Sequence, residues 1–177
     1  MRRRLTSTAA LALASLLIVQ RPAVAAQVET IDRVLAVVAG RLIMLSDVTA
    51  ARDLGLVPNV GASDSVRTVL NQLIDRELML AEVERYAPPD PSPDALDREM
   101  AAVRARFDSP SAFDAILART GIDSDHVRET LRQNLRIREY QAQRFVPSDP
   151  ARQSRIEDWI AGLRRRGDIV DLYGSGQ

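Results

Sequence analysis

The sequence predicts a mainly helical domain that opens with a small β-hairpin and ends with a short strand paired to that hairpin. Three observations predict this class. Two short apolar runs flank Ala39-Gly40, and the segments after them carry apolar residues at helical spacing between proline and glycine stops. A short segment at 168–173, with the β-branched or apolar residues Ile169, Val170 and Leu172, follows the last of these helical segments. A strand at the end of a helical chain needs a partner, and the hairpin is the available one.

The hairpin is expected first. Residues 33–38 and 41–45 are apolar runs rich in Val, Leu and Ile, and Ala39-Gly40 forms the turn between them. Neither run alternates strictly, so both faces of the hairpin can be covered. Ser46-Asp47 is then expected to cap a short helix that ends at residues 53–55.

Five helices are expected downstream, each with a start signal or a stop signal. Asp64, Ser92, Ser109 and Asp123 are the expected N-caps of the first four, and proline follows two of the serines directly. The expected helices cover residues 66–86, 93–107, 110–120, 124–145 and 152–166. The first is central, because Leu78-Met79-Leu80 widens its apolar stripe. Gly167 ends the last helix before the terminal strand.

Composition excludes several classes of protein. The chain has 24 acidic and 24 basic residues, every basic residue is Arg, and Cys is absent. Disulfide scaffolds, cysteine nucleophiles and zinc sites built on cysteine are therefore excluded, as are lysine Schiff bases and phosphate-binding P-loops. The balanced charge offers no electrostatic basis for binding nucleic acid. We expect no cofactor.

Residues 1–26 have the three parts of a secretory signal peptide. Arg2-Arg3-Arg4 precedes an apolar stretch at 5–19, and Ala23-Val24-Ala25 is a small-x-small cleavage site. The stretch is short for a membrane span, although an uncleaved anchor is the alternative. Cleavage would remove four Arg and no acidic residue, so the mature chain, a single domain over 27–177, is mildly acidic. We expect it to be periplasmic, without stable membrane insertion.

Residues capable of chemistry are few, and ordinary structural roles explain them. His126 is the only histidine and stands at an expected helix start beside Asp123 and Asp125. A general base or a metal ligand works only with other functional groups directed at the same point, and the sequence shows none beside His126. We therefore expect His126 to be a surface residue at the start of the helix. Arg164-Arg165-Arg166 fits the last turn of a helix, where cations complement the helix dipole. We expect no catalytic residues and no metal ligands.

The order of these elements resembles the N-terminal chaperone module of the SurA and parvulin-like periplasmic family. Residues 31–38 with 43–48 are similar to that family's opening hairpin, and residues 73–80 to its central helix. Residues 113–121 with 128–139 resemble its later helix pair. The resemblance covers 31–146, and residues 160–173 resemble the segment that closes the module.

The chain differs from that family in one respect, which determines the activity that the resemblance implies. In the family, one or two parvulin isomerase domains lie before the closing helix and strand, whereas here only residues 146–151 occupy that place. Six residues cannot hold a domain. The resemblance therefore implies the chaperone module (31–146) joined directly to its closing segment (151–173), without peptidyl-prolyl isomerase activity.

The expected function is that of an ATP-independent chaperone that binds unfolded polypeptides, outer-membrane proteins among them. Such binding needs exposed apolar surface, and flexible methionine suits varied clients. The candidate client-binding residues are Met79, Phe107, Phe113 and Tyr140, although residues of these types are more often found in the core than at its rim. Two alternatives stay open. One is an interaction or structural module that joins a partner through its sheet edge, and the other is an accessory of a prolyl isomerase system.

Overall fold

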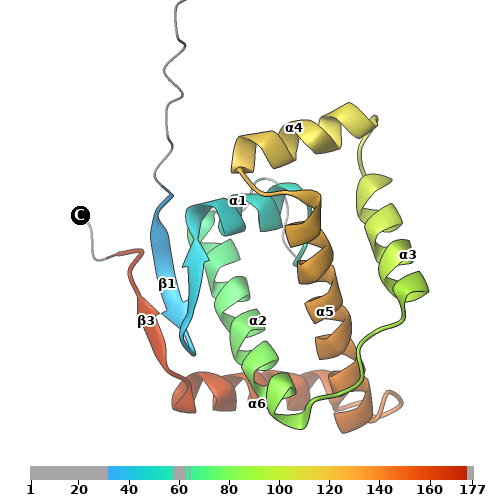
Figure 1. The fold of residues 1–177 in the computed structure, drawn as a ribbon. Helices are drawn as coiled ribbons and strands as arrows, with labels where there is room; N and C mark the ends of the chain where they lie inside the picture. The colour runs from blue at the N-terminus through green and yellow to red at the C-terminus, as the bar shows by residue number, and fades with distance from the viewer. Residues whose placement is uncertain (1–31, 58–62, 64, 175–177) are drawn as a thin grey trace, which may run out of the picture. The chain divides into compact units, whose positions relative to one another are not determined.

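The computed structural model describes residues 32–57, 63 and 65–174 (Figure 1). Its elements are β1 (Val34–Val38), β2 (Arg41–Met44), α1 (Leu45–Asp53), α2 (Val66–Tyr86), α3 (Pro93–Arg104), α4 (Pro110–Thr120), α5 (Ser124–Arg144), α6 (Arg152–Arg166) and β3 (Ile169–Asp171). The mainly helical class, the hairpin and the C-terminal strand are thereby confirmed. The expected signal peptide, residues 1–26, lies outside the described residues.

The three strands form one antiparallel sheet in the order β2-β1-β3. Val37 of β1 pairs with Leu42 on one side and with Val170 on the other. Ala39 and Gly40 both have positive φ, 49° and 79°, as the tight two-residue turns of hairpins require. The terminal strand therefore pairs with the hairpin as the sequence predicts, and it joins the two ends of the described chain.

A bulge in β1 explains why two successive residues of a strand face the core. The register between β1 and β2 shifts between Val34 and Ala36, so Leu35 is an extra residue opposite β2. Leu35 and Ala36 are both fully buried. A bulge turns neighbouring side chains to one face, which a regular strand cannot do. This is the physical reason that the apolar run does not alternate.

Helix α2 is the centre of the fold. It packs against α1, α5, α6 and the sheet (Figure 1), and its buried apolar residues recur at helical spacing. These residues are Val69, Leu70, Leu73, Ile74, Leu78, Leu80 and Val83. On the far side of α5 lies α3, while α4 packs on α1. Each of these helices buries its apolar stripe, which is the main stabilising term of the domain.

The helix starts follow the predicted signals where serine or aspartate precedes the helix directly. Ser92, Ser109 and Asp123 are N-caps, and each side chain accepts a hydrogen bond from a backbone N–H three residues on. At α2 the prediction of Asp64 as the cap is wrong, because Ser65 is the N-cap and accepts from the Thr68 N–H. Asp64 itself lies outside the described residues.

Helix α1 begins earlier than predicted, because two carboxylates act from other positions. Leu45 is its first residue, so Ser46-Asp47 is not the cap. Asp47 instead reaches back from the third helical position and accepts the Met44 N–H at 2.8 Å. Asp32, just before β1, accepts from the backbone N–H and the hydroxyl of Ser46. Two carboxylates therefore bind the orphan N–H groups of the first turn.

Helix α3 ends at Arg104, before the predicted Phe107. The N–H groups of Arg106 and Phe107 bond to carbonyls only three residues back, a tightened turn that ends a helix. The Arg106 guanidinium also donates to the carbonyls of Leu54 and Gly55, at 3.0 and 2.7 Å. These bonds tie the end of α3 to the end of α1.

In the described part of the chain, no helix is both long and apolar enough to cross a membrane.

Candidate functional site

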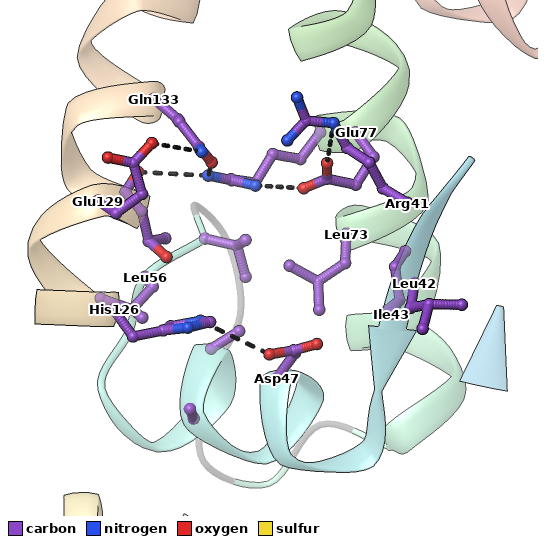
Figure 2. Close-up of a pocket in the computed structure, with 15 residues that line it drawn as sticks. Arg41, Leu42, Ile43, Asp47, Leu56, Leu73, Glu77, His126, Glu129 and Gln133 are labelled. Atoms are coloured by element: carbon purple, nitrogen blue, oxygen red, sulfur yellow. Dashed lines mark hydrogen bonds and ion pairs between the residues drawn. The ribbon is translucent and has the colours of Figure 1, made fainter. Parts of the chain in front are cut away.

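A cleft of about 210 Å³ opens between β2 and α5, and we call it the β2–α5 cleft (Figure 2). Arg41, Leu42 and Ile43 of β2 line one side, and α5 lines the other. Helix α2 contributes Leu73, Arg76 and Glu77, and α1 contributes Asp47, Ala50 and Ala51. Apolar side chains from β2, α1, α2 and the segment after α1 therefore meet polar side chains from α5 and α2.

Arg76 is the buried cation at the base of this cleft. Only 7% of it is exposed, yet each guanidinium nitrogen has a partner. Nε donates to Asn134 Oδ1 and Nη2 to Gln133 Oε1, both at 2.7 Å. Nη1 bonds Glu77, and Figure 2 shows the contacts with Gln133 and Glu77. Burial lowers the pKa of Arg76, and the Glu77 carboxylate opposes that shift. A paired, hydrogen-bonded arginine here joins α2 to α5.

Asp47 and His126 face each other across the mouth of the cleft, one from α1 and the other from the first turn of α5 (Figure 2). His126 Nε2 lies 3.6 Å from Asp47 Oδ1, and half of the His126 side chain is exposed. Burial raises the pKa of Asp47, against the lowering effects of the Met44 N–H and of His126. The contact joins the start of α5 to α1, and it becomes an ion pair when His126 is protonated.

A second pocket, of about 300 Å³, lies between α2, α3 and α5, and we call it the α3 pocket. It shares Arg76, Leu56 and Val57 with the β2–α5 cleft. Its apolar lining comprises Leu56, Val57, Met79, Val103, Leu131 and Ile137. Several polar side chains at its edge are bonded within the protein: Asn134 donates to the Leu56 carbonyl, Arg138 pairs with Glu99, and Gln141 Nε2 lies 3.3 Å from Met79 Sδ. The two hollows thus adjoin along the contact between α2 and α5.

The four predicted client-binding residues are not brought together. Met79 is half-buried and lines the α3 pocket. Phe107 is half-buried beside the buried Phe113, with ring centroids 5.8 Å apart. Tyr140, 7% exposed, packs between Tyr86 and Trp159, and burial raises its pKa. Phe113 and Tyr140 are therefore core residues in this structure, and only Met79 faces the adjoining hollows.

Apart from Met79, the residues that line these hollows were not among the predicted client-binding residues. In the sequence, Arg76 lies between the apolar positions Ile74 and Leu78 of α2. An arginine that is buried with such neighbours needs polar partners inside the protein. Its partners lie more than fifty residues away, at Thr130, Gln133 and Asn134. Leu42 was assigned to the hairpin, with nothing in the sequence to place it beside α5. The sequence pattern around Arg76 could therefore indicate a buried arginine, whereas the position of Leu42 beside the cleft follows only from the folded structure.

The site contains no grouping suited to metal catalysis. Among the described residues, no three His, Asp or Glu side chains gather as a metal ion would require. A scan against protein-family models gives no match. A search of curated proteins gives no match either. The two hollows and the sequence motifs are therefore the basis on which a function can be assigned.

Proposed function

We propose that the chain is an ATP-independent periplasmic chaperone that holds unfolded polypeptides, outer-membrane proteins among them. The observation that carries the proposal is the pair of adjoining hollows, apolar within and polar at the edge, that opens on both sides of Arg76. Ligand sites in proteins commonly combine an apolar lining with a few fixed polar groups. Such a surface binds apolar segments without reacting with them.

The polar groups beside these hollows are already satisfied, which suits a client without a fixed sequence. Arg76, Asn134 and Gln141 each bond within the protein, so none demands a partner from a particular client side chain. Met79 offers a flexible and polarizable contact that adapts to different shapes. Weak selectivity of this kind is what a holding chaperone needs.

The link between α5 and α6 supports a holding role without an isomerase domain. Residues 145–151 connect the two helices, and Asp149 stabilises the link by accepting from the Ala151 N–H and pairing with Arg155. A compact link of seven residues has no room for another domain. We therefore propose that the chain does not act as a prolyl isomerase.

The proposal is tested by aggregation of an unfolded outer-membrane porin diluted from urea. The mature chain at several-fold molar excess should suppress light scattering without ATP. Met79→Leu should keep this effect, because volume and polarity are nearly conserved. Met79→Glu should reduce it several-fold, because desolvating a carboxylate against an apolar client is unfavourable. If the wild-type chain leaves the scattering unchanged, the proposal is wrong.

Photo-crosslinking tests whether the α3 pocket is the surface that binds the client. A benzophenone side chain at Arg138, on the edge of the α3 pocket, should crosslink to the unfolded porin. The same group at Glu157, exposed on α6 outside both hollows, should crosslink far less. Equal yields at the two positions would contradict the pocket as the binding surface. Melting curves from circular dichroism show whether each variant is folded.

One observation favours the alternative of an interaction module. The outer face of the sheet carries Leu42, Val170 and Leu172 as large exposed apolar side chains. Leu42 and Val170 flank Val37 in one cross-strand row. An exposed apolar face on a small sheet is typical of a surface that meets a folded partner. Capture of one folded partner, with no effect on porin aggregation, would favour this function.

A further inference from the structure

Strand β2 has a free edge, and that edge faces the β2–α5 cleft. Within the described part of the chain, β2 pairs with β1 alone. Figure 2 shows β2 along one side of the cleft and α5 along the other. An edge strand presents backbone N–H and C=O groups that can pair with another chain. In this fold, the backbone N–H and C=O groups on the free edge of β2 point towards the β2–α5 cleft.

The register identifies which residue of β2 presents its backbone to the cleft. Ala39 donates its N–H to the Asp168 carbonyl, so the odd-numbered residues at this end of β1 bond to β3. The even-numbered residues Ala36 and Val38 then bond to their partners on β2, which are Ile43 and Arg41. Leu42, between those partners, directs its N–H and C=O away from β1.

The next outward-facing donor of β2 is already used. The Met44 N–H donates to Asp47 Oδ2 at 2.8 Å. Leu42 is therefore the position at which an added strand would exchange hydrogen bonds with the sheet. Its side chain is 59% exposed on the outer face of the sheet, so access to its backbone does not depend on moving a packed side chain.

The lining of the cleft selects uncharged segments. Ile43, Leu73 and Leu56 give it an apolar interior. The charged groups on the β2 side and at the base of the cleft are compensated within the protein: Arg41 pairs with Glu84 and Glu77, and Arg76 with Glu77. A charged client residue placed beside them would lose its hydration without gaining an unpaired opposite charge, which is unfavourable. An extended chain whose inward residues are apolar meets the apolar interior.

We propose that an extended segment of an unfolded client binds as a fourth strand beside β2, pairing with the backbone of Leu42 while apolar side chains enter the β2–α5 cleft. This inference rests on the proposed holding function and specifies how one of its two hollows is used. Binding through the backbone is independent of client sequence, and alternate side chains supply the preference for apolar character. The partner is therefore a strand-forming polypeptide with uncharged residues at every second position.

The test compares Leu42→Pro with Leu42→Ala. Proline removes the N–H that would donate to the added strand, yet it is tolerated in an edge strand where that N–H faces away from the ladder. Arg41, which precedes it, is already extended, as a residue before proline must be. Alanine removes the same exposed side chain and keeps the N–H. The pair therefore isolates the backbone donor.

The probe is a fluorescein-labelled nine-residue peptide of alternating Val and Thr, and binding is followed by fluorescence anisotropy. Leu42→Pro should weaken binding at least tenfold relative to Leu42→Ala. Methylating the backbone nitrogens of the peptide on the edge that would face β2 should weaken binding to the wild-type chain similarly. Equal affinity of the proline and alanine variants would overturn the inference.

Hydrogen exchange on the wild-type chain keeps the inference testable if the proline variant does not fold. Saturating peptide should slow exchange of the Leu42 amide at least tenfold, and unchanged exchange with peptide bound would overturn the inference. If porin aggregation is suppressed equally by the proline and alanine variants, the strand mode is wrong and the holding function stands. If the wild-type chain binds neither peptide nor porin, both proposals are wrong.

Discussion

At the scale of single residues, the most informative group is Asp47, a half-buried carboxylate at the mouth of the β2–α5 cleft. Its carboxylate accepts the Met44 N–H and faces His126 at 3.6 Å, but loss of hydration dominates and raises its pKa. A raised folded-state pKa means that the native state holds its proton more tightly than the unfolded chain does. The contribution of Asp47 to stability is therefore fully present below the unfolded value near 3.8, and it is lost as pH rises through the folded value.

Asp47→Asn should consequently be tolerated better at neutral pH than in acid. The asparagine carbonyl can still accept the Met44 N–H, and the cost of burying a charge disappears. We expect the unfolding free energy of the variant, relative to wild type, to be more favourable at pH 7 than at pH 4. Urea titrations at the two pH values measure the difference. A relative stability that is the same at both would contradict the assigned burial effect.

Arg76→Met tests the buried cation without removing its volume. The change leaves Asn134 and Gln133 without their donor in a half-buried position. Breaking such a network typically costs about 3 kcal/mol of unfolding free energy. Urea denaturation measures this loss, and Arg132→Met serves as the control because Arg132 pairs at the surface with Glu129. A surface pair is worth about 1 kcal/mol or less. Equal losses in the two variants would contradict the structural role of Arg76.

At the scale of elements, Gly162 inside α6 and Gly167, which caps its C-terminus, should respond oppositely to alanine. At Gly167 a Cβ would lie 2.4 Å from Leu78 Cδ2 and 2.9 Å from the Leu163 carbonyl, so the buried Leu78 side chain and the turn that ends α6 must both shift. At Gly162, inside the helix, the nearest atom is the flexible end of Arg166. We expect Gly167→Ala to cost about 1–3 kcal/mol and Gly162→Ala to stabilise by about 0.5–1 kcal/mol. Thermal melts compare them, and a shift of the same sign in both variants would contradict the close approach at Gly167.

Strand β3 should contribute to the stability of the domain, because it pairs with β1. Ile169 and Tyr173 pack against the core, and Asp171 pairs with Arg67, which holds the pKa of that carboxyl low. Deleting residues 168–177 would remove these contacts together with the ladder to β1. We expect a loss of about 2–4 kcal/mol of unfolding free energy, on the scale of losing buried apolar side chains. An unchanged denaturation midpoint for the truncated chain would show that the strand adds little.

The elements themselves were largely predictable from sequence, because their boundaries are set locally. Ser92-Pro93, Ser109-Pro110 and Asp123 act within one helical turn of their own position, and the structure confirms all three. The start of α1 was predicted wrongly, because Asp32 caps it from fourteen residues away. Local chemistry is readable from a sequence, whereas a cap supplied by another element requires the fold.

The hollows were much less predictable than the helices. Helical spacing shows which face of α2 points inward, but it does not show whether a neighbour fills the space above that face. Phe113 and Met79 occupy comparable apolar positions in the sequence, yet one is buried in the core and the other lines the α3 pocket. The difference depends on how α3 and α5 pack around each residue, which periodicity alone does not determine.

At the scale of the whole molecule, the link over residues 145–151 joins α5 to the closing segment, which consists of α6 and β3. Val146, Pro147 and Ser148 are exposed, and the closing segment is held by its own contacts with α2 and β1. The closure of the fold therefore does not depend on the length of this link. A longer link costs only the entropy of a larger loop, which grows slowly with length.

Inserting ten Gly and Ser residues between Pro147 and Ser148 should therefore leave the domain folded. The expected cost is about 1 kcal/mol from loop entropy, which corresponds to a fall of about 2–4 °C in Tm. The same insertion between Ala39 and Gly40 is the matched control. That turn needs two residues of positive φ to set the register of β1 and β2, so the insertion should cost several times more. Differential scanning calorimetry of both variants measures the contrast. Unfolding caused by the 147–148 insertion would show that the closing segment depends on its short tether, and a chain of this architecture could not then accept a domain at that position.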